Sequence, residues 1–464
     1  MKNIFKRKPS DFATEYTVSN ALMKGDILTR LSFIFLGAGN IARKQIVKGL
    51  LFLFTEICYI YYMISYGIFA LKEFTYLGDY KKEEIETDWG GYEYVFSGTE
   101  SVKVLLFGVA TIVITLLFVA FWRECVKSAY KAQCATKRGE HVNTFIDDIK
   151  DLFNVNLHKL LLALPLAGIL TLTVLPLIFM MLMAFTNYSD ALSADGKTTF
   201  LMKFDWVALQ SFKDVLDING NIGEQFWGVL TWTLIWAVFA TVLNYIGGMI
   251  LAIVINRKGT RLKGLWRFNF ILSIAIPQFV SLLIMRTMLS DVGAINNLLL
   301  EWGVIDQALP FWTNATWARV TVIIVNLWVG IPYTMLQLTG VLQNIPAELY
   351  EAAKVDGANA VTTFFKITLP YMLFVTMPYL ITTFTGNINN FNVIYLLTGG
   401  GPGKLGHTAG QTDLLVTWLY KLTIDQYDYN IGAVIGIMTF VVLAIVSLVT
   451  FRNTGSYKDE EGFQ

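Results

Sequence analysis

The chain has 464 residues, of which 55% are hydrophobic and only 15% are charged, and its formal net charge is +1. Soluble domains carry about 25% charged residues, and so much apolar surface would leave large sticky patches in water. The near-zero net charge excludes a basic nucleic-acid-binding protein and an acidic disordered chain. The composition therefore indicates an integral membrane protein.

Residues 1–48 precede the first long apolar run and hold nine basic residues. Within them, Ile27–Leu36 is apolar, too short to cross a bilayer, and placed behind a long mixed-charge leader. This arrangement does not fit a cleavable signal peptide. We expect Ile27–Leu36 to form a helix that lies on the membrane surface.

Eight apolar stretches are long enough to span a bilayer, because a helix crosses roughly 30 Å of hydrocarbon in about 20 residues. They are long continuous runs rather than ten-residue alternations, which favours helices over a barrel. The predicted fold is therefore an all-α integral membrane protein with eight transmembrane helices. The predicted spans are Leu50–Leu71, Val104–Trp122, Leu160–Phe185, Phe226–Ile255, Trp266–Leu289, Val320–Leu342, Tyr371–Leu397 and Ile431–Phe451.

The basic residues alternate from one connection to the next as far as 290–316, whereas the connection that follows is not especially basic and its side is inferred from its neighbours. Residues 1–48 and 123–159 are rich in Lys and Arg, whereas acids dominate 72–103 and 186–225. A compact basic cluster at 257–263 follows, and 290–316 has no Lys or Arg. Because basic connections stay on the cytoplasmic side, we expect both termini in the cytoplasm of a bacterial cell.

The connections also predict the domain organisation. After the cytoplasmic segment 1–48, two accessory spans occupy 49–122, and a polar cytoplasmic connection occupies 123–159. Six further spans form a core over 160–455, and 456–464 form a cytoplasmic tail.

Polar side chains inside spans are costly and often functional. Asn326 and Tyr333 lie seven residues apart, so two helical turns put them on one face, with Gly330 between them. Late in the seventh span, Gly386 precedes a group of three asparagines, Asn387, Asn389 and Asn390.

Asparagine offers paired donors and acceptors that suit the hydroxyls of a neutral sugar. Tyr333 and Phe391 could present flat apolar faces to a pyranose ring. The alternative is that these asparagines hold helices together, a common use of polar groups in bilayers.

Glu56 is the one carboxylate well inside a predicted span. A proton or ion role is possible for it, but it lies in an accessory span, and a packing role is the simpler interpretation. Spans three to eight hold no interior Asp or Glu, which favours an external energy source over ion coupling.

No catalytic constellation or metal site is expected. The three cysteines and three histidines have no metal-ligand spacing. The segment Thr398–Leu405 superficially resembles a phosphate loop, but its first glycine is replaced by Thr398 and Lys404 is followed by Leu405. We therefore expect a flexible turn there, and a chain that binds no ATP or other cofactor itself.

The connection 344–370 predicts a helix–turn–helix on the cytoplasmic side. Ala347–Val355 are mostly good helix formers after Pro346, and Gly357 can take the left-handed conformation that ends a helix. A second helix is predicted over Ala360–Thr368, closed by Pro370. From helix physics alone, an ordinary capped loop remains an alternative.

This connection resembles the EAA motif of the membrane subunits of ABC importers. The matching residues are Glu351-Ala352-Ala353, then Gly357, then Ile367-x-Leu369-Pro370. The resemblance implies that residues 346–370 are a coupling loop that docks into a separate cytoplasmic ATPase. Its contact residues would be Glu351, Ala352, Ala353, Asp356 and Gly357.

The resemblance extends over roughly 160–455 to the larger permease subunit of maltose/maltodextrin importers. It is carried by the segments Phe185–Ser189, Asn326–Tyr333, Asn387–Phe391 and Leu396–Pro402. That subunit also has eight spans, the first two accessory, and its sugar site implies substrate contacts at Asn326, Gly330, Tyr333, Asn387 and Asn390. Gly386 stands where the relative has an aromatic residue, and the connection 186–225 is shorter.

The resemblance therefore implies a permease subunit of an ATP-driven importer for an oligosaccharide, with maltodextrin as the first expectation. Its partners would be a second permease subunit, an ATPase homodimer that binds ATP and Mg²⁺, and an extracytoplasmic solute-binding protein. The competing hypothesis is an ion-coupled secondary transporter or a channel for a neutral solute.

Overall fold

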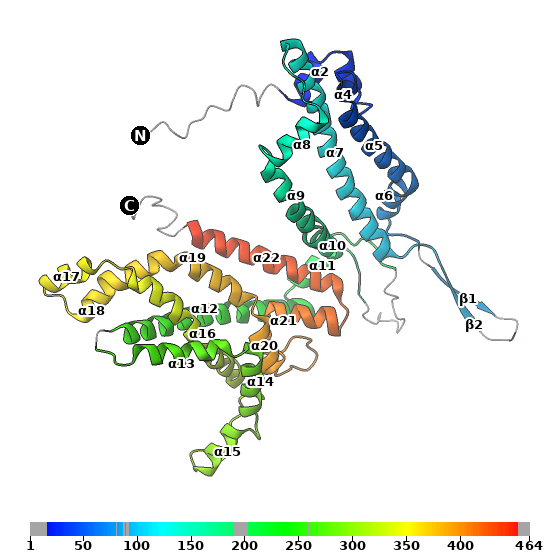
Figure 1. Cartoon of the computed structure of the whole chain (residues 1–464). Coiled ribbons are helices and arrows are strands. Elements are labelled where there is room, and N and C mark those ends of the chain that lie inside the picture. The colour runs from blue at the N-terminus through cyan, green and yellow to red at the C-terminus, as the bar shows by residue number, and fades with distance from the viewer. Residues whose placement is uncertain are drawn as a thin grey trace. The chain divides into compact units, whose positions relative to one another are not determined.

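The computed structural model of the chain describes residues 16–79, 81–86, 89, 92–189, 203–257 and 259–452, which are mainly helical (Figure 1). In these ranges seven helices are long and apolar enough to cross a membrane, and one bent helix pair provides an eighth candidate span. All eight overlap the predicted spans, so the all-α membrane class is confirmed. The seven are Ile46–Phe74, Ser101–Arg138, Leu157–Met183, Asn221–Asn256, Ala315–Gln343, Ala360–Thr398 and Tyr429–Arg452.

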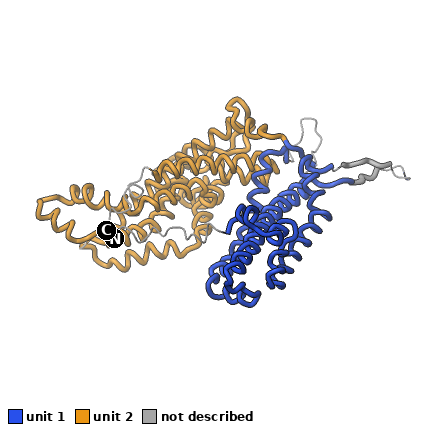
Figure 2. Tube along the Cα trace, turned by 90° about the horizontal axis from the view of Figure 1, so that it is seen from above, with its two compact units in different colours: residues 1–188, 199–206 blue, residues 189–198, 207–464 orange. Residues whose placement is uncertain are grey.

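The chain divides into two compact units (Figure 2). Unit 1 consists of residues 1–188 and 199–206, and unit 2 consists of residues 189–198 and 207–464. The first three candidate spans belong to unit 1 and the others to unit 2. The predicted domain boundaries, with a core that begins at residue 160, stay a prediction.

In unit 1, α5 (Ile46–Tyr62) continues through a π-helical turn into α6 (Ile68–Phe74), and α6 packs against α7 (Ser101–Arg138). The ring of Tyr59 in α5 stacks on that of Phe118 in α7, with their centroids 3.8 Å apart. At Gly108 the two helices come so close that an added Cβ would lie 2.2 Å from the ring of Phe74. Aromatic stacking and a small residue at the contact thus hold these helices together.

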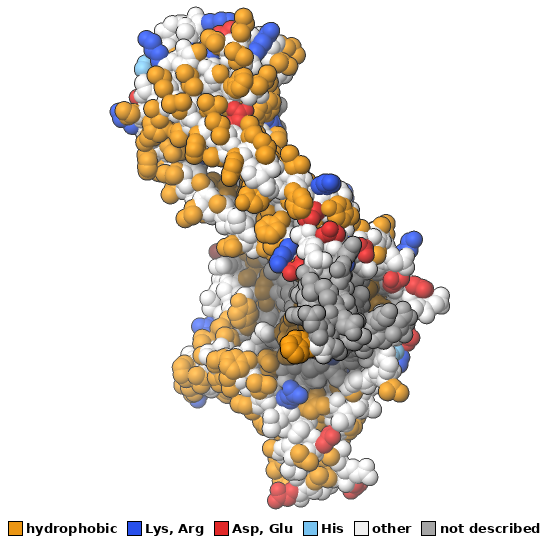
Figure 3. All heavy atoms as spheres, turned by 90° about the vertical axis from the view of Figure 1, so that its right-hand side faces the viewer, with side chains coloured by type: hydrophobic (Ala, Val, Ile, Leu, Met, Phe, Trp, Pro, Cys, Tyr) orange, Lys and Arg blue, Asp and Glu red, His pale blue; other side chains and the backbone are white. Residues whose placement is uncertain are grey.

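The third candidate span is formed by α9 (Leu157–Ile169), a π-helical turn and α10 (Leu175–Met183). Its side chains are largely exposed, with Leu164 at 82% and Leu172 at 80%. Figure 3 shows hydrophobic side chains over much of the visible side of unit 1. A surface of this kind is stable against lipid tails rather than water.

The N-terminal part of unit 1 forms short helices instead of one surface helix over Ile27–Leu36. The helix α3 begins at Ile27, after the Asp26 cap, and ends at Leu31. The chain then turns through Gly37, whose φ is +85°, and the backbone N–H of Leu36 donates to Glu56 Oε2 over 2.8 Å. The predicted helix is therefore shorter, and Glu56 has a structural partner. The other short helices of unit 1 are α2 (Val18–Lys24), α4 (Ala38–Ile41) and α8 (Phe145–Phe153).

An antiparallel hairpin connects α6 to α7 and was not predicted. Its strands are β1 (Lys81–Glu86) and β2 (Tyr92–Ser97), with Lys81 opposite Ser97 and Glu86 opposite Tyr92. Charged residues dominate β1, and aromatic residues are frequent in β2. Because the connection as a whole is acidic, the short apolar and polar pattern of these residues did not indicate strands.

The core of unit 2 is built on α12 (Asn221–Asn256), α16 (Ala315–Gln343) and α19 (Leu369–Ile388). An added Cβ at Gly248 of α12 would lie 2.8 Å from the Thr334 side chain and 2.9 Å from the Met335 backbone nitrogen of α16. The hydroxyls of Tyr245 and Thr376 lie 2.7 Å apart and join α12 to α19. Small residues thus bring the backbones together, and a buried hydrogen bond fixes the third helix.

The fifth candidate span is a bent pair, α13 (Lys263–Ala275) and α14 (Gln278–Met288), with an angle of 87° between its helices. The predicted continuous helix Trp266–Leu289 is wrong at this point. Pro277 disfavours the helical conformation of the residue before it, and Ile276 is extended with ψ near 127°. At the break, the backbone of Ile276 and Pro277 is not helical.

The helix after the predicted coupling loop does not end at Pro370. It runs from α18 (Ala360–Thr363) through a π-helical turn at Phe364–Thr368 directly into α19. Pro370 occupies the first turn of α19, where its missing N–H is accommodated by the wider π-helical turn before it. The next break falls at Asn389, before α20 (Phe391–Thr398).

The glycine-rich segment after α20 is not a loose turn. Asp413 is fully buried there and accepts hydrogen bonds from the Gly410 N–H over 2.7 Å, the Thr417 hydroxyl over 2.9 Å and Lys421 Nζ over 2.6 Å. Burial raises the pKa of the Asp413 carboxyl, and the Lys421 ammonium opposes that rise. This buried ion pair organises the connection to the last span. The remaining helices of unit 2 are α11 (Gln210–Leu216), α15 (Ala294–Glu301), α17 (Ala347–Val355), α21 (Leu415–Tyr420) and α22 (Tyr429–Arg452).

The close approach at Gly248 predicts a loss of stability on substitution. Gly248→Ala should lower the free energy of unfolding by about 1–3 kcal/mol, because its methyl group would meet the backbone of α16. Gly228→Ala in the same helix is the control, since nothing lies within 4 Å of its added Cβ. Thermal unfolding in detergent measures both variants, and equal midpoints would contradict the packing described here.

Candidate functional site

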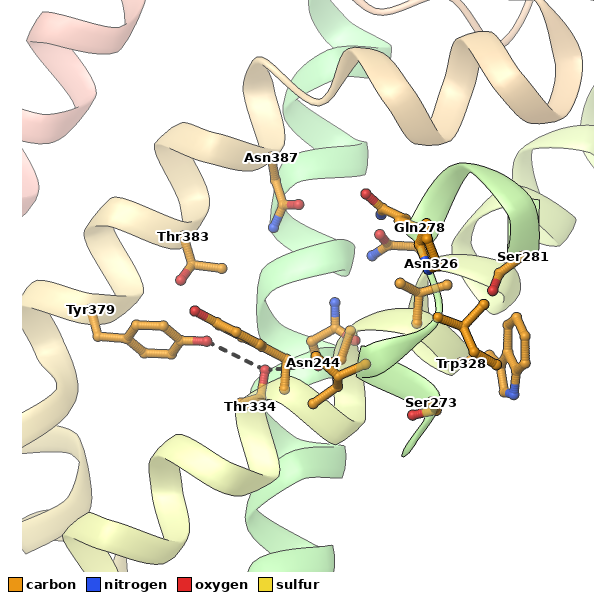
Figure 4. Close-up of a pocket in the computed structure, with 16 residues that line it drawn as sticks. Asn244, Ser273, Gln278, Ser281, Asn326, Trp328, Thr334, Tyr379, Thr383 and Asn387 are labelled. Atoms are coloured by element: carbon orange, nitrogen blue, oxygen red, sulfur yellow. Dashed lines mark hydrogen bonds between the residues drawn. The ribbon is translucent and has the colours of Figure 1, made fainter. Parts of the chain in front are cut away.

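A polar cavity of about 430 Å³ lies in the middle of unit 2 (Figure 4). Four parts of the unit line it, namely α12, the break between α13 and α14, α16 and α19. Its lining residues are Asn244, Ser273, Ile274, Ile276, Pro277, Gln278, Ser281, Asn326, Trp328, Val329, Gly330, Tyr333, Thr334, Tyr379, Thr383 and Asn387. None of these carries a formal charge, and amides and hydroxyls face an otherwise apolar enclosure.

Four of the five predicted substrate residues come together in this cavity. Asn326, Gly330 and Tyr333 follow one another along α16, as the seven-residue spacing predicted, and Asn387 comes from α19. Tyr333 is 53% exposed, so its ring is accessible. Whether these residues bind substrate stays a prediction.

Asn390 is not among the lining residues. Its Oδ1 accepts from the Val393 N–H over 3.3 Å and caps α20, while its Nδ2 lies 3.5 Å from Asn387 Oδ1. Phe391 is also outside the cavity, where its ring stacks on Tyr395 with a centroid distance of 4.7 Å. These two residues can therefore support the site only through their neighbours.

Two amide groups of the cavity lack partners. Asn326 Nδ2 and Asn244 Oδ1 are buried and make no hydrogen bond within the described residues. Unsatisfied buried polar atoms are costly and rare in native proteins, where an ordered water, an ion or a functional role explains them. Asn387 differs, because its Nδ2 donates to Thr241 Oγ1 over 3.0 Å, and its backbone carbonyl oxygen accepts from Trp236 Nε1 over 3.0 Å.

Asn244 and Gln278 were missed in the sequence. Asn244 is a polar residue within a span, so the reasoning that singled out Asn326 could have found it. Asn244 packs directly against Gly330 of α16, because an added Cβ at Gly330 would lie 2.6 Å from the Asn244 side chain. Gln278 enters the cavity only because the span breaks at Pro277, which the apolar pattern did not show.

The predicted coupling loop is the second candidate site, and its first helix α17 (Ala347–Val355) has the predicted bounds. Gly357 follows it with φ at +74°, and the Ala358 N–H donates to the Ala353 carbonyl over 2.9 Å. This left-handed glycine cap ends the helix and turns the chain towards α18.

The surface of the coupling loop combines acidic and apolar residues. Glu351, Ala352, Asp356 and Gly357 are exposed, whereas Ala353 is buried against the unit. At the tip, Val355 is 88% exposed. Four of the five predicted contact residues are thus accessible to a partner, and their contact with an ATPase stays a prediction.

The comparisons with known proteins agree with this architecture. Residues 244–454 match the family described as binding-protein-dependent transport system inner membrane component. The galactooligosaccharides transport system permease protein GanP of Bacillus subtilis is 34% identical over 430 residues, which are 91% of this chain and 96% of that protein. The maltodextrin transport system permease protein MdxF of the same bacterium is 31% identical over 457 residues, which are 96% of this chain and 99% of that protein.

A solved structure has a similar fold. It is a bacterial ABC transporter involved in the import of the acidic polysaccharide alginate, with a TM-score of 0.52 and 22% identity, and the match covers 65% of this chain and 96% of that one.

A multi-pass membrane fold with a polar central cavity and an exposed EAA loop defines a transporter permease subunit. The chain belongs to the family of binding-protein-dependent transport system inner membrane components, the permease subunits of ABC importers. The predicted resemblance to the larger permease of sugar importers is confirmed.

Because Asn326 has an unpaired amide and Asn387 does not, substitution of the two residues should affect stability differently. Asn326→Leu should leave the thermal midpoint unchanged or raise it, because the lost Nδ2 has no partner. Asn387→Leu should lower the free energy of unfolding by about 1 kcal/mol, because it removes the bond to Thr241. Thermal unfolding in detergent compares the two, and a larger loss for Asn326→Leu would contradict an amide kept for a ligand.

Proposed function

We propose that the chain forms half of the pathway of an ATP-driven importer for a neutral oligosaccharide, with maltodextrin as the first substrate to test. The observation that carries this proposal is the cavity itself. Its lining residues include amides, hydroxyls and aromatic rings but no acid or base. Such a surface can satisfy sugar hydroxyls without paying for a buried charge.

The relatives support the same substrate class. One is named for galactooligosaccharides and another for maltodextrin, and both match this chain over nearly its whole length. Galactooligosaccharides are the other candidate, because the permease named for them is 34% identical to this chain. Uptake of labelled maltotriose and of a galactotriose by the reconstituted transporter distinguishes them.

In the proposed binding mode, Asn326 Nδ2 and Asn244 Oδ1 supply one donor and one acceptor to sugar hydroxyls. The exposed ring of Tyr333 covers a pyranose face, and Gly330 leaves room for the Asn244 side chain. Asn387 binds substrate next to them. Asn390 positions Asn387 from outside the cavity and caps α20.

ATP hydrolysis belongs to partner subunits in this proposal. An ATPase homodimer that holds ATP and Mg²⁺ binds residues 346–370, with contacts to the exposed Glu351, Ala352, Asp356 and Gly357, while the buried Ala353 packs the helix against the unit. Basic residues of the ATPase would pair with the exposed acids, and an apolar surface would receive Val355. The loop transmits force only if the ATPase contacts it differently in its two states.

The assembly has a defined orientation. Both termini and the coupling loop lie in the cytoplasm of a bacterial cell, and a second permease subunit completes the pathway. An extracytoplasmic solute-binding protein delivers the sugar near 186–225, 290–316 and 400–430. The alternation of basic connections supports this orientation.

The alternative of ion coupling is weaker. Glu56, its only candidate, accepts a backbone hydrogen bond from Leu36 in unit 1 and so has a structural role. Uptake into sealed vesicles distinguishes the two hypotheses, because an ATP-driven importer stops when ATP is depleted. Uptake that continues without ATP would support the ion-coupled transporter.

The substrate site predicts a loss of uptake on truncation of Asn326. Asn326→Ala should lower kcat/KM for uptake about tenfold, because one hydrogen bond to a sugar hydroxyl is lost. Asn389→Ala is the control, since Asn389 is exposed and does not line the cavity. Initial rates over a range of sugar concentrations measure both variants, and equal kinetics would remove Asn326 from the site.

If residues 346–370 couple the chain to an ATPase, a change in this loop should stop transport without preventing membrane insertion. Gly357→Pro should abolish uptake but leave membrane insertion intact, because proline requires φ near −65° and Gly357 has +74°. Gly357→Asn is the matched control, since asparagine tolerates the left-handed conformation. Normal uptake by the proline variant, measured in vesicles with equal amounts of protein, would refute the coupling role.

A further inference from the structure

A second large cavity lies at the end of unit 2 that carries the coupling loop. Its volume is about 760 Å³, and three groups of residues line it. One group surrounds the connection from α12 to α13, a second consists of Leu342 and Gln343 at the end of α16, and the third comes from α17, the turn after it, α18 and the π-helical turn that follows. Figure 1 shows the α12–α13 connection and α17–α18 at the same end of the unit.

The charge of this cavity is one-sided. Arg257, Lys263 and Arg267 line it, and no carboxylate does. Within the described part of the chain, none of these three cations forms a salt bridge, although seven Lys or Arg side chains pair with carboxylates elsewhere in the two units. Three unpaired cations in a concave site create a positive potential that attracts an anion.

The hydrogen bonds of the cations leave capacity for a ligand. Arg267 donates through Nη2 to Asn256 Oδ1, while its Nε is buried without a partner. Lys263 Nζ donates to the Asn256 carbonyl oxygen over 3.1 Å and can donate twice more. A guanidinium with a free N–H beside an ammonium suits the oxygens of a phosphate group.

We propose that this cavity is a binding site for a phosphate group, carried by an anionic lipid headgroup or by a soluble phosphate ester. The site lies at the end of spans that have exposed apolar residues, with Leu262 at 71%, Leu265 at 52% and Trp266 at 49%. Acyl chains could cover these residues while the headgroup enters the cavity. Tyr350 and Phe364 line the same cavity, so an occupant braces the coupling loop against α12 and α13.

This proposal does not depend on which solute is transported. The full chain is reconstituted in nanodiscs of phosphatidylcholine alone or with phosphatidylglycerol, and native mass spectrometry measures retained lipid. Titration calorimetry with inorganic phosphate and glucose 6-phosphate tests the soluble source in the phosphatidylcholine discs. Either source supports the proposal, and the arm that responds identifies it.

The variants locate the site. The double variant K263Q/R267Q should weaken binding roughly 25-fold, from about fivefold for each cation removed. R257Q should weaken it about fivefold, and it removes an exposed side chain that the fold does not need. R261Q is the matched control, because Arg261 belongs to the same basic connection but does not line the cavity.

Three results would overturn the proposal. They are equal binding by R261Q and R257Q, no binding from either phosphate source, and lost copurification of the partner ATPase in R257Q with phosphate binding unchanged. The last result would mean that the cations contact a protein instead.

Discussion

Hydrocarbon offers no hydrogen-bond partner to a broken backbone, and this constraint determines where unit 2 can be interrupted. Irregular backbone is tolerated at membrane depth only where protein or a polar cavity covers it. The fifth span breaks between Ala275 and Gln278, and Ile276, Pro277 and Gln278 all line the central cavity. The break and the cavity therefore occur together, because the backbone of the break faces the polar space that the cavity provides.

The coupling loop and the central cavity are joined by continuous helix. From Ala360 to Ile388 the chain runs through α18, a π-helical turn and α19 without leaving the helical conformation. Tyr379, Thr383 and Asn387 of α19 line the central cavity, and residues 360–364 belong to the coupling loop. A displacement of the loop can thus reach the residues that line the cavity as motion of one continuous element.

The sequence predicted the features that rest on local rules. The eight apolar runs indicated the spans, helix formers between Pro346 and Gly357 gave the bounds of α17, and helical spacing placed Asn326 and Tyr333 on one face. The misses depend on tertiary context. Pro277 breaks its span, whereas Pro370 follows a π-helical turn and Pro332 lies inside the continuous helix α16, so a proline in an apolar run does not by itself show whether the helix breaks. The strands β1 and β2 pair through backbone groups, which composition does not show.

The asparagines also show that sequence alone does not determine the role of a polar residue. Asn387 is held by Thr241 and Trp236, Asn390 caps α20, and Asn326 keeps an unpaired Nδ2. In sequence all three are polar residues in or beside apolar spans, and their different roles follow from neighbours that lie far away along the chain. The unpaired group costs free energy in the empty state. A ligand that accepts a hydrogen bond from Asn326 Nδ2 would offset that cost. The unpaired atom that lowers the stability of the empty cavity would then favour ligands with an acceptor at this position.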